Sequence, residues 1–155
     1  MWRDGKGYSY EGGHRIPFIA RWPDRIEPGT SSAAMITMTD LFATAADIVR
    51  QELPSDAAED SFSLLPVLLG REEKIVGRKA IFILGNGKDS AVAVGSEQWK
   101  LIVRYGDDED RGNELYDLSK DPGEQTNVIN DHPVIAEQLS AAYRKAESDG
   151  RTRPR

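Results

Sequence analysis

The sequence contains no cysteine, and this absence excludes several kinds of site at once. Disulfide bridges, thiolate metal ligands and a cysteine nucleophile all require thiols. Cysteine usage often indicates the redox compartment of a protein, and here it gives no indication. The cellular location of this protein is therefore unknown from its sequence.

Long apolar runs and an excess of basic residues are missing as well. No run of about 18 apolar residues occurs, so we expect no membrane-spanning helix, and no basic-then-apolar leader opens the chain. The 20 basic residues are outnumbered by 26 acidic ones, which gives a formal net charge of −6. An acidic chain repels polyanions, so we expect neither nucleic acid nor membrane as a partner. An anionic substrate would need local cations.

The first half of the chain has the pattern of a loop, a strand and two helices. Gly5 to Gly13 is glycine-rich and predicts a loop. The apolar run Ile16–Trp22 predicts a buried strand. Apolar residues then recur at helical spacing, which predicts a helix over about residues 40–50 and a shorter one ending at Gly70.

The second half has the pattern of a small sheet followed by a helix. Four short strand-like runs follow one another at 80–84, 90–94, 99–104 and 114–118. Short connections between them, among them a predicted hairpin turn at Gly85–Lys88, indicate an antiparallel sheet. From Pro133 the apolar spacing becomes helical, with a stripe suited to covering one side of the sheet.

Four sequence blocks, in this order and spacing, resemble the closing part of sulfatases of the alkaline phosphatase superfamily. The most specific block runs from Gly5 to Pro23 and contains Gly-Lys-Gly, then Glu-Gly-Gly, then an arginine and a proline. The other blocks are 39–44, 63–70, and 99–102 taken together with 114–118 and 121–124. Ala43 departs from the family, which usually has proline there. The resemblance covers about residues 4–146 and represents the last third of a typical arylsulfatase-like member.

The resemblance implies an α+β fold in two parts. Residues 1–72 would contribute a strand and a helix to the large catalytic α/β domain of a sulfatase. Residues 73–148 would form the smaller C-terminal subdomain, an antiparallel sheet of about four strands packed by a C-terminal helix. Residues 149–155 are expected to be a disordered tail. Members of the family are often secreted or periplasmic.

One substrate contact follows from the resemblance. In the family, the lysine of the Gly-Lys-Gly block contacts the substrate sulfate, which implies this role for Lys6. A flexible ammonium with three donors suits a sulfate oxygen, whereas a loop lysine considered alone is usually a solvated surface residue. Glu11 and Arg15 are expected to form an ion pair that holds the Lys6 loop. We expect structural roles for His14 and His132.

The residues that perform the family's reaction are missing from this sequence. In the family, a cysteine or serine in a Cys/Ser-x-Pro-x-Arg motif becomes formylglycine, and a calcium ion holds the sulfate oxygens. This chain has no cysteine, and none of its serines is followed two places on by proline. The family's calcium ligands lie before the Gly-Lys-Gly block. We therefore assign no catalytic residue, metal ligand or cofactor to this chain, and calcium and formylglycine only to the longer parent.

Two other interpretations stay open. The chain could be a noncatalytic module that binds a partner chain or a glycan, with Ile16–Trp22 as an exposed strand that invites self-association. It could also belong to a related phosphatase or phosphonate ester hydrolase of the same superfamily, although the Glu-Gly-Gly block favours a sulfatase. In the sulfatase interpretation, the sulfated substrate would be bound together with the parent's catalytic part.

The absence of a nucleophile gives a direct prediction. The purified chain, assayed with an aryl sulfate and calcium, is expected to show no turnover above the buffer background. Product release above that background, proportional to the amount of chain added, would contradict the assignment of all catalytic residues to the parent.

Overall fold

The computed structural model describes residues 1–85 and 89–154, so most of the predicted Gly85–Lys88 turn lies outside the described residues. The chain forms two compact units. The first consists of Met1–Pro17 and Ala80–Lys145, and the second of Phe18–Lys79 and Ala146–Arg155. The assignment of residues 1–72 to a larger catalytic domain concerns a longer protein and stays a prediction.

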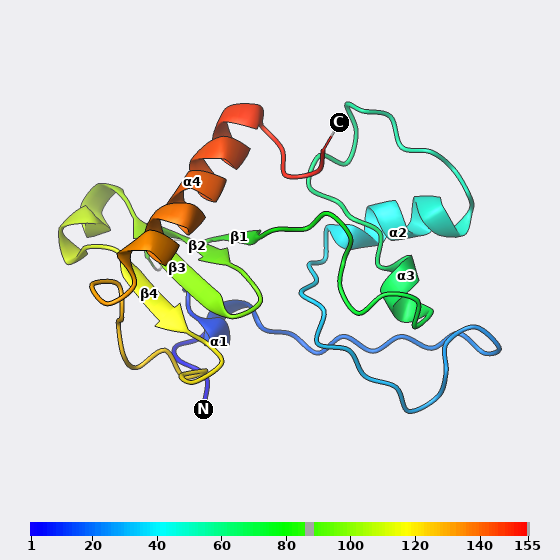
Figure 1. The fold of residues 1–155 in the computed structure, drawn as a ribbon, viewed down its shortest axis with the longest axis horizontal. Coiled ribbons are helices and arrows are strands. Elements are labelled where there is room, and N and C mark those ends of the chain that lie inside the picture. The colour runs from blue at the N-terminus through cyan, green and yellow to red at the C-terminus, as the bar shows by residue number, and fades with distance from the viewer. Residues whose placement is uncertain (86–88, 155) are drawn as a thin grey trace. The chain divides into compact units, whose positions relative to one another are not determined.

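The first unit is built around an antiparallel sheet of four strands (Figure 1). The strands are β1 (Ile81–Leu84), β2 (Ala91–Gly95), β3 (Trp99–Arg104) and β4 (Glu114–Asp117). Each strand pairs with its neighbour in sequence, which gives the spatial order β1-β2-β3-β4. The predicted antiparallel sheet is confirmed.

One face of this sheet is covered by the C-terminal helix α4 (Pro133–Asp149). Proline at the first helical position costs the helix no hydrogen bond, and Gly150 follows the last turn with a φ of 65°, a usual helix end. Side chains that alternate along the strands point to this face. The buried cluster between sheet and helix comprises Ala80, Val92, Val94, Leu101, Leu115, Ala136 and Leu139. The predicted packing of the last helix is confirmed.

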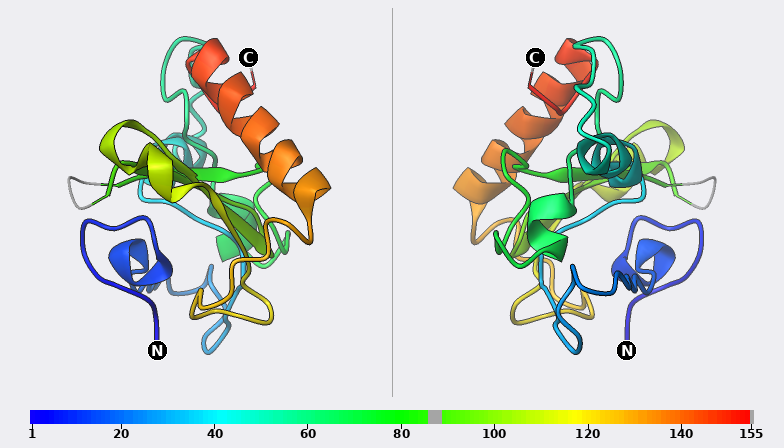
Figure 2. Two further views of the ribbon diagram at one scale, coloured as in Figure 1. Left: turned by 90° about the vertical axis from the view of Figure 1, so that its left-hand side faces the viewer. Right: turned by 90° about the vertical axis from the view of Figure 1, so that its right-hand side faces the viewer.

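The opening segment, which is Met1–Pro17, covers the opposite face of the sheet. Its only regular element is α1 (Glu11–His14), a single helical turn that begins inside the loop predicted over Gly5 to Gly13 and ends one residue beyond it. Figure 2 shows α1 and α4 on opposite sides of the sheet. The second buried cluster comprises Tyr10, Ala91, Ala93, Ile102 and Tyr116. Small alanines on β2 let the opening segment approach the sheet closely.

The second unit contains α2 (Asp40–Ile48) and the short α3 (Leu65–Leu68), close to the predicted positions. Its core is formed by Phe62, Leu64 and Ile75. The buried carboxylate of Asp40 accepts hydrogen bonds from the backbone N–H groups of Thr37, at 2.7 Å, and Phe62, at 3.1 Å. Arg78 completes this arrangement by an ion pair with Asp40.

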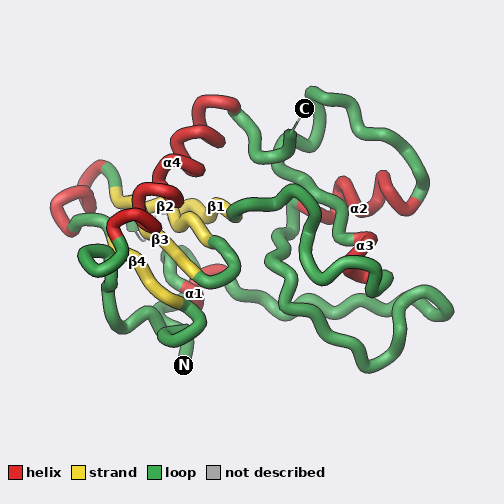
Figure 3. Tube along the Cα trace, in the orientation of Figure 1, coloured by secondary structure: helices red, strands yellow, loops and turns green. Residues whose placement is uncertain are grey.

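The predicted strand at Ile16–Trp22 is wrong for this chain. The structure has no strand pairing there, and Figure 3 shows loop from the end of α1 to the start of α2. Ile16 is 62% exposed and Ile19 is 91% exposed. A strand is stable only where neighbouring backbone satisfies its N–H and C=O groups, and no such neighbour lies beside this run in the described part of the chain.

The tail also differs from the expectation of disorder. The backbone N–H groups of Thr152 and Arg153 both donate to the carbonyl oxygen of Glu59, at 3.2 and 2.7 Å. The guanidinium of Arg153 donates to the carbonyls of Pro54 and Ala57. Arginine is the residue that supplies enough donors to bind several loop carbonyls at once.

Among the described residues, no helix is both long and apolar enough to span a bilayer.

Candidate functional site

Lys6 lies at the tip of a tight turn. The backbone N–H of Tyr8 donates to the carbonyl of Gly5 at 3.2 Å, which closes a four-residue turn with Lys6 and Gly7 at its centre. Gly7 has a φ of 98°, the left-handed value that the third position of a type II turn requires. The turn presents Lys6, whose side chain is exposed, to solvent.

The two glycines of the Glu-Gly-Gly block pack closely against the backbone of this turn and of the residues just before it. A Cβ atom at Gly12 would overlap the carbonyl oxygens of Arg3 and Asp4. A Cβ at Gly13 would overlap the Tyr8 carbonyl oxygen and lie 3.0 Å from that of Gly5. Gly13 therefore contacts both ends of the Lys6 turn, and any side chain there would push the turn away.

Glu11 and Arg15 form the predicted ion pair. The Nε atom of Arg15 lies 2.5 Å from Oε2 of Glu11, across one helical turn. Glu11 is buried, while the Arg15 side chain is about half exposed and lies with its guanidinium 4.1 Å from the centre of the Trp2 ring. The pair lies directly after the Lys6 turn, and its role in holding that turn stays a prediction.

Two further charged residues meet Glu11, and neither was among the residues predicted for the site. Lys100 of β3 is 1% exposed, and its Nζ lies 3.2 Å from Oε1 of Glu11 and 2.8 Å from Oε1 of Glu124. Glu124 is fully buried and accepts the backbone N–H of Glu11 at 2.7 Å. The period-two pattern of β3 could have placed Lys100 on one face with Ile102, but no local signal names its partners.

His14 completes the cluster as a neutral base. Its Nε2 lies 3.0 Å from Nζ of Lys100. Burial and the neighbouring ammonium of Lys100 lower the pKa of His14 to about 4, so the imidazole is uncharged near neutral pH. The predicted structural role agrees with this position. His132 packs against the ring of Trp99, with 4.8 Å between ring centres, immediately before α4 begins.

The two carboxylates in contact with Lys100 differ in acidity. Burial alone would raise the pKa of Glu11, but the charge of Lys100 and the hydrogen bond from Arg15 outweigh it and lower that pKa. Burial raises the pKa of Glu124, and Lys100 offsets this only in part. Glu11 is therefore the more firmly ionised partner.

A second group of contacts holds the start of the opening segment. The guanidinium of Arg3 stacks 3.8 Å from the centre of the Tyr10 ring and donates to the Tyr116 hydroxyl at 2.9 Å. It also donates to the Glu124 carbonyl at 2.8 Å. The Tyr10 hydroxyl donates to Glu114 at 2.8 Å. Aromatic rings and paired charges thus fix both sides of the Lys6 turn on the sheet.

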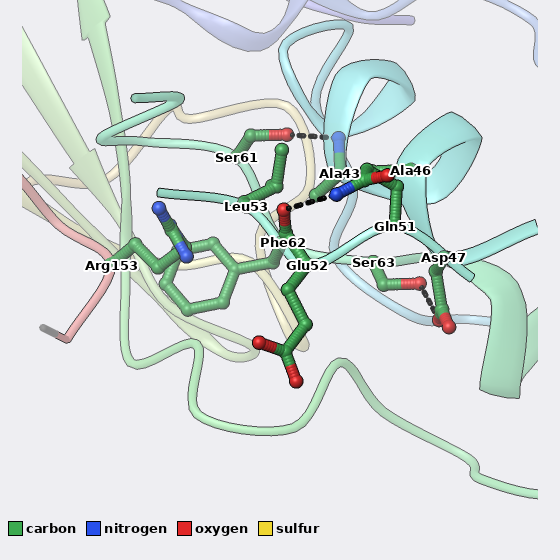
Figure 4. A pocket seen from close by; sticks show the side chains of 10 residues that line it. All are labelled: Ala43, Ala46, Asp47, Gln51, Glu52, Leu53, Ser61, Phe62, Ser63 and Arg153. Atoms are coloured by element: carbon green, nitrogen blue, oxygen red, sulfur yellow. Dashed lines mark hydrogen bonds between the residues drawn. The ribbon is translucent and has the colours of Figure 1, made fainter. Parts of the chain in front are cut away.

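A separate cavity of about 350 Å³ lies in the second unit, beside α2 (Figure 4). Its polar groups are largely bonded to one another: Ser61 accepts the N–H of Ala43, and the Ser63 hydroxyl donates to Asp47. Asp47 and Glu52 make its lining acidic, and Arg153 is bound by loop carbonyls. The cavity is therefore unsuited to an anionic ligand.

No group of three or more histidine, aspartate or glutamate residues in the described ranges could hold a metal ion. The acidic stretch within Gly106–Arg111 forms a 3₁₀ helix instead. The residues that the structure describes therefore do not fit a calcium site of the kind implied for the parent. The sequence also offers no cysteine from which formylglycine could be made.

Comparison with known proteins identifies the family. The model of the family described as N-sulphoglucosamine sulphohydrolase, C-terminal, matches residues 1–148. This chain belongs to that family of sulfatase C-terminal domains. The resemblance seen in the sequence is confirmed, and the four-stranded sheet with its C-terminal helix is the architecture that the chain shares with solved relatives.

Three relatives illustrate the similarity. An N-acetylgalactosamine-6-O-sulfatase of Bacteroides thetaiotaomicron is 37% identical over 151 residues, which cover 90% of this chain and 29% of the relative. A structure solved in work on the metabolism of multiple glycosaminoglycans by Bacteroides thetaiotaomicron has a TM-score of 0.81 at 35% identity, covering 95% of this chain and 32% of that one. The structure of a protein in complex with its substrate, D-glucosamine-2-N,6-O-disulfate, has a TM-score of 0.77 at 27% identity. The match covers 91% of this chain and 30% of that protein. The chain spans less than a third of the length of each relative.

The close approach at Gly13 predicts a sharp difference between two glycine substitutions. Gly13→Ala places a methyl group against backbone oxygens and is expected to destabilise the chain by about 1–3 kcal/mol, as overpacking does. Gly5→Ala is the control, because a Cβ there meets nothing within 4 Å and the φ of Gly5 is not positive. Urea denaturation measures both. Equal midpoints for the two variants would contradict the packing described.

Proposed function

We propose that this chain is the C-terminal part of a sulfatase that hydrolyses sulfate esters, and that Lys6 contacts the substrate sulfate. Membership of the sulfatase family supports the reaction class. The observation that carries the role of Lys6 is the turn itself, since Lys6 is exposed on a turn whose two ends rest on Gly13. A preorganised ammonium binds an anion without first ordering its own loop.

Sulfated sugars are the substrate class that this proposal favours. The relatives include an N-acetylgalactosamine-6-O-sulfatase and a protein solved with a disulfated glucosamine. Lys6 is a single cation on a chain of net charge −6, so it would contribute one local contact to a sulfate rather than a general attraction to polyanions.

Formylglycine and calcium belong, in this proposal, to the complete enzyme, where they supply the nucleophile and hold the sulfate oxygens. The described residues contain no group of three or more histidine, aspartate or glutamate side chains that could hold a metal ion, and the sequence has no cysteine and no serine followed two places on by proline. In this proposal the chain contributes the binding and orientation of sulfate by Lys6. By itself the chain is inactive in this proposal.

The proposed role of Lys6 predicts that added sulfate binds at the Lys6 turn. Addition of sodium sulfate to the chain is expected to shift the amide NMR signals of residues 5–8, and Lys6→Ala should weaken this response roughly tenfold, because a charge-assisted hydrogen bond is lost. Sodium chloride at equal ionic strength controls for screening. Lys79→Ala, which removes another exposed lysine, should leave the response unchanged. Equal sulfate affinity in the Lys6→Ala and Lys79→Ala variants would contradict the proposal.

Self-association is a second candidate function, supported by one observation. The Ile16–Trp22 run is unpaired in the structure, and Ile16, Phe18 and Ile19 are exposed. Exposed apolar backbone with free hydrogen-bonding groups is a template for pairing with another chain. In this proposal two copies pair through the run, with or without an exchange of segments.

Light scattering at high protein concentration tests this second candidate. The wild-type chain is expected to form dimers, and Ile19→Lys should shift the population toward monomer by placing a charge in the paired run. Val76→Lys is the matched control, since Val76 is an exposed apolar residue elsewhere in the chain, at 69% exposure. A wild-type chain that remains monomeric would refute self-association without affecting the sulfate proposal.

A further inference from the structure

We propose that Lys100 is a positioning residue for the Lys6 turn, and that Glu124 assists it. This inference rests on the proposed role of Lys6 in sulfate binding. Lys100 projects from β3 toward the opening segment, where its Nζ forms hydrogen bonds with His14 Nε2 at 3.0 Å and Glu11 Oε1 at 3.2 Å. It also forms an ion pair with Oε1 of Glu124 at 2.8 Å.

The contacts of Lys100 lie on either side of the glycines that support the turn. Glu11 and His14 are the first and last residues of α1, and Gly12 and Gly13 lie between them. Gly13 contacts the carbonyl oxygens of Gly5 and Tyr8, the two ends of the Lys6 turn. By holding both ends of α1, Lys100 therefore fixes the surface on which the turn rests.

The charges of the cluster explain why a cation is required at this position. Glu124 is fully buried, and its Oε2 accepts the backbone N–H of Glu11 at 2.7 Å. Without Lys100, the buried carboxylates of Glu11 and Glu124 would repel each other, and of the ion pairs that the structure describes for them, the one between Glu11 and the half-exposed Arg15 would remain. Like charges at such proximity repel, and a buried charge that has lost its partner is strongly unfavourable. The opening segment would then move away from the sheet.

The backbone at Glu124 is an independent observation in favour of this role. Glu124 is not a glycine, yet its φ is 54°, in the left-handed region that side chains disfavour. Such a conformation persists only where the surroundings hold it. Here the hydrogen bond from Glu11 and the ion pair with Lys100 hold the Glu124 carboxylate. These two contacts bind the strained turn after β4 to the opening segment and to β3.

The geometry also determines the tautomer of His14. An ammonium can only donate, so Nε2 of His14 accepts from Lys100 and carries no proton. The remaining proton of the neutral ring then lies on Nδ1. His14 is therefore unable to donate a proton from Nε2, and its tautomer reports directly on the Lys100 contact.

Nitrogen NMR of the whole chain tests the inference with two readouts. In the wild type, His14 should show the Nδ1–H tautomer alone, and sulfate should shift the Lys6 amide. Lys100→Met, which keeps the length of the side chain and removes its charge, should convert His14 to a mixture of tautomers and weaken sulfate binding at Lys6 about tenfold. Lys100→Arg should restore part of the Nδ1–H tautomer of His14 and part of the sulfate affinity. Lys120→Met removes a lysine that is 80% exposed and should change neither.

The two readouts separate this inference from the proposed function. If sulfate fails to shift the wild-type Lys6 amide, the sulfate role of Lys6 is wrong, while the His14 tautomer and amide exchange of residues 5–8 still test positioning by Lys100. A Lys100→Met variant with wild-type tautomer, exchange and sulfate affinity would overturn the inference. If that variant does not fold, Glu124→Gln takes its place and should speed amide exchange in residues 5–8; wild-type exchange there would overturn the inference equally.

Discussion

The ammonium of Lys100 is the charge on which the candidate site depends. A cation that is 1% exposed is tolerable only when its donors are satisfied and its charge is balanced. Glu11 and Glu124 provide that balance, and they come from the opening segment and from the turn after β4. The burial of one side chain therefore couples three stretches of chain that are distant in sequence, and the Lys6 turn rests on the point where they meet.

The sheet can hold this charge because its two faces differ. Leu101 points toward α4 and joins an apolar cluster, while its neighbours Lys100 and Ile102 point the other way. The apolar stem of a lysine packs well on such a face while its end reaches carboxylates. One strand thus contributes to a hydrophobic core on one side and to an ionic cluster on the other. In our proposal the sheet therefore also supports the Lys6 turn, which contacts the sulfate.

Local patterns predicted much of the fold and part of the site. The four strands, α2 and α4 were predictable because the spacing of apolar residues reflects which side of an element is buried. The Glu11–Arg15 pair was predictable because residues four apart meet on one helical turn. The strand at Ile16–Trp22 was predicted wrongly for the same reason, since an apolar run indicates a tendency to be buried but not the presence of a neighbour. The hydrogen-bonded tail at Thr152 and Arg153 was missed because its partners lie about ninety residues earlier.

The sequence by itself determined the family, the order of the four strands and of α2 and α4, and the lysine proposed to contact sulfate, because these depend on residues close together in the chain. Only the tertiary structure decided which residues surround that loop. Lys100 and Glu124 lie 89 and 113 positions from Glu11 in sequence, and nothing in their local patterns indicates that they meet. Their contact follows from packing the opening segment against the sheet, where the loss of water makes each buried charge require a partner.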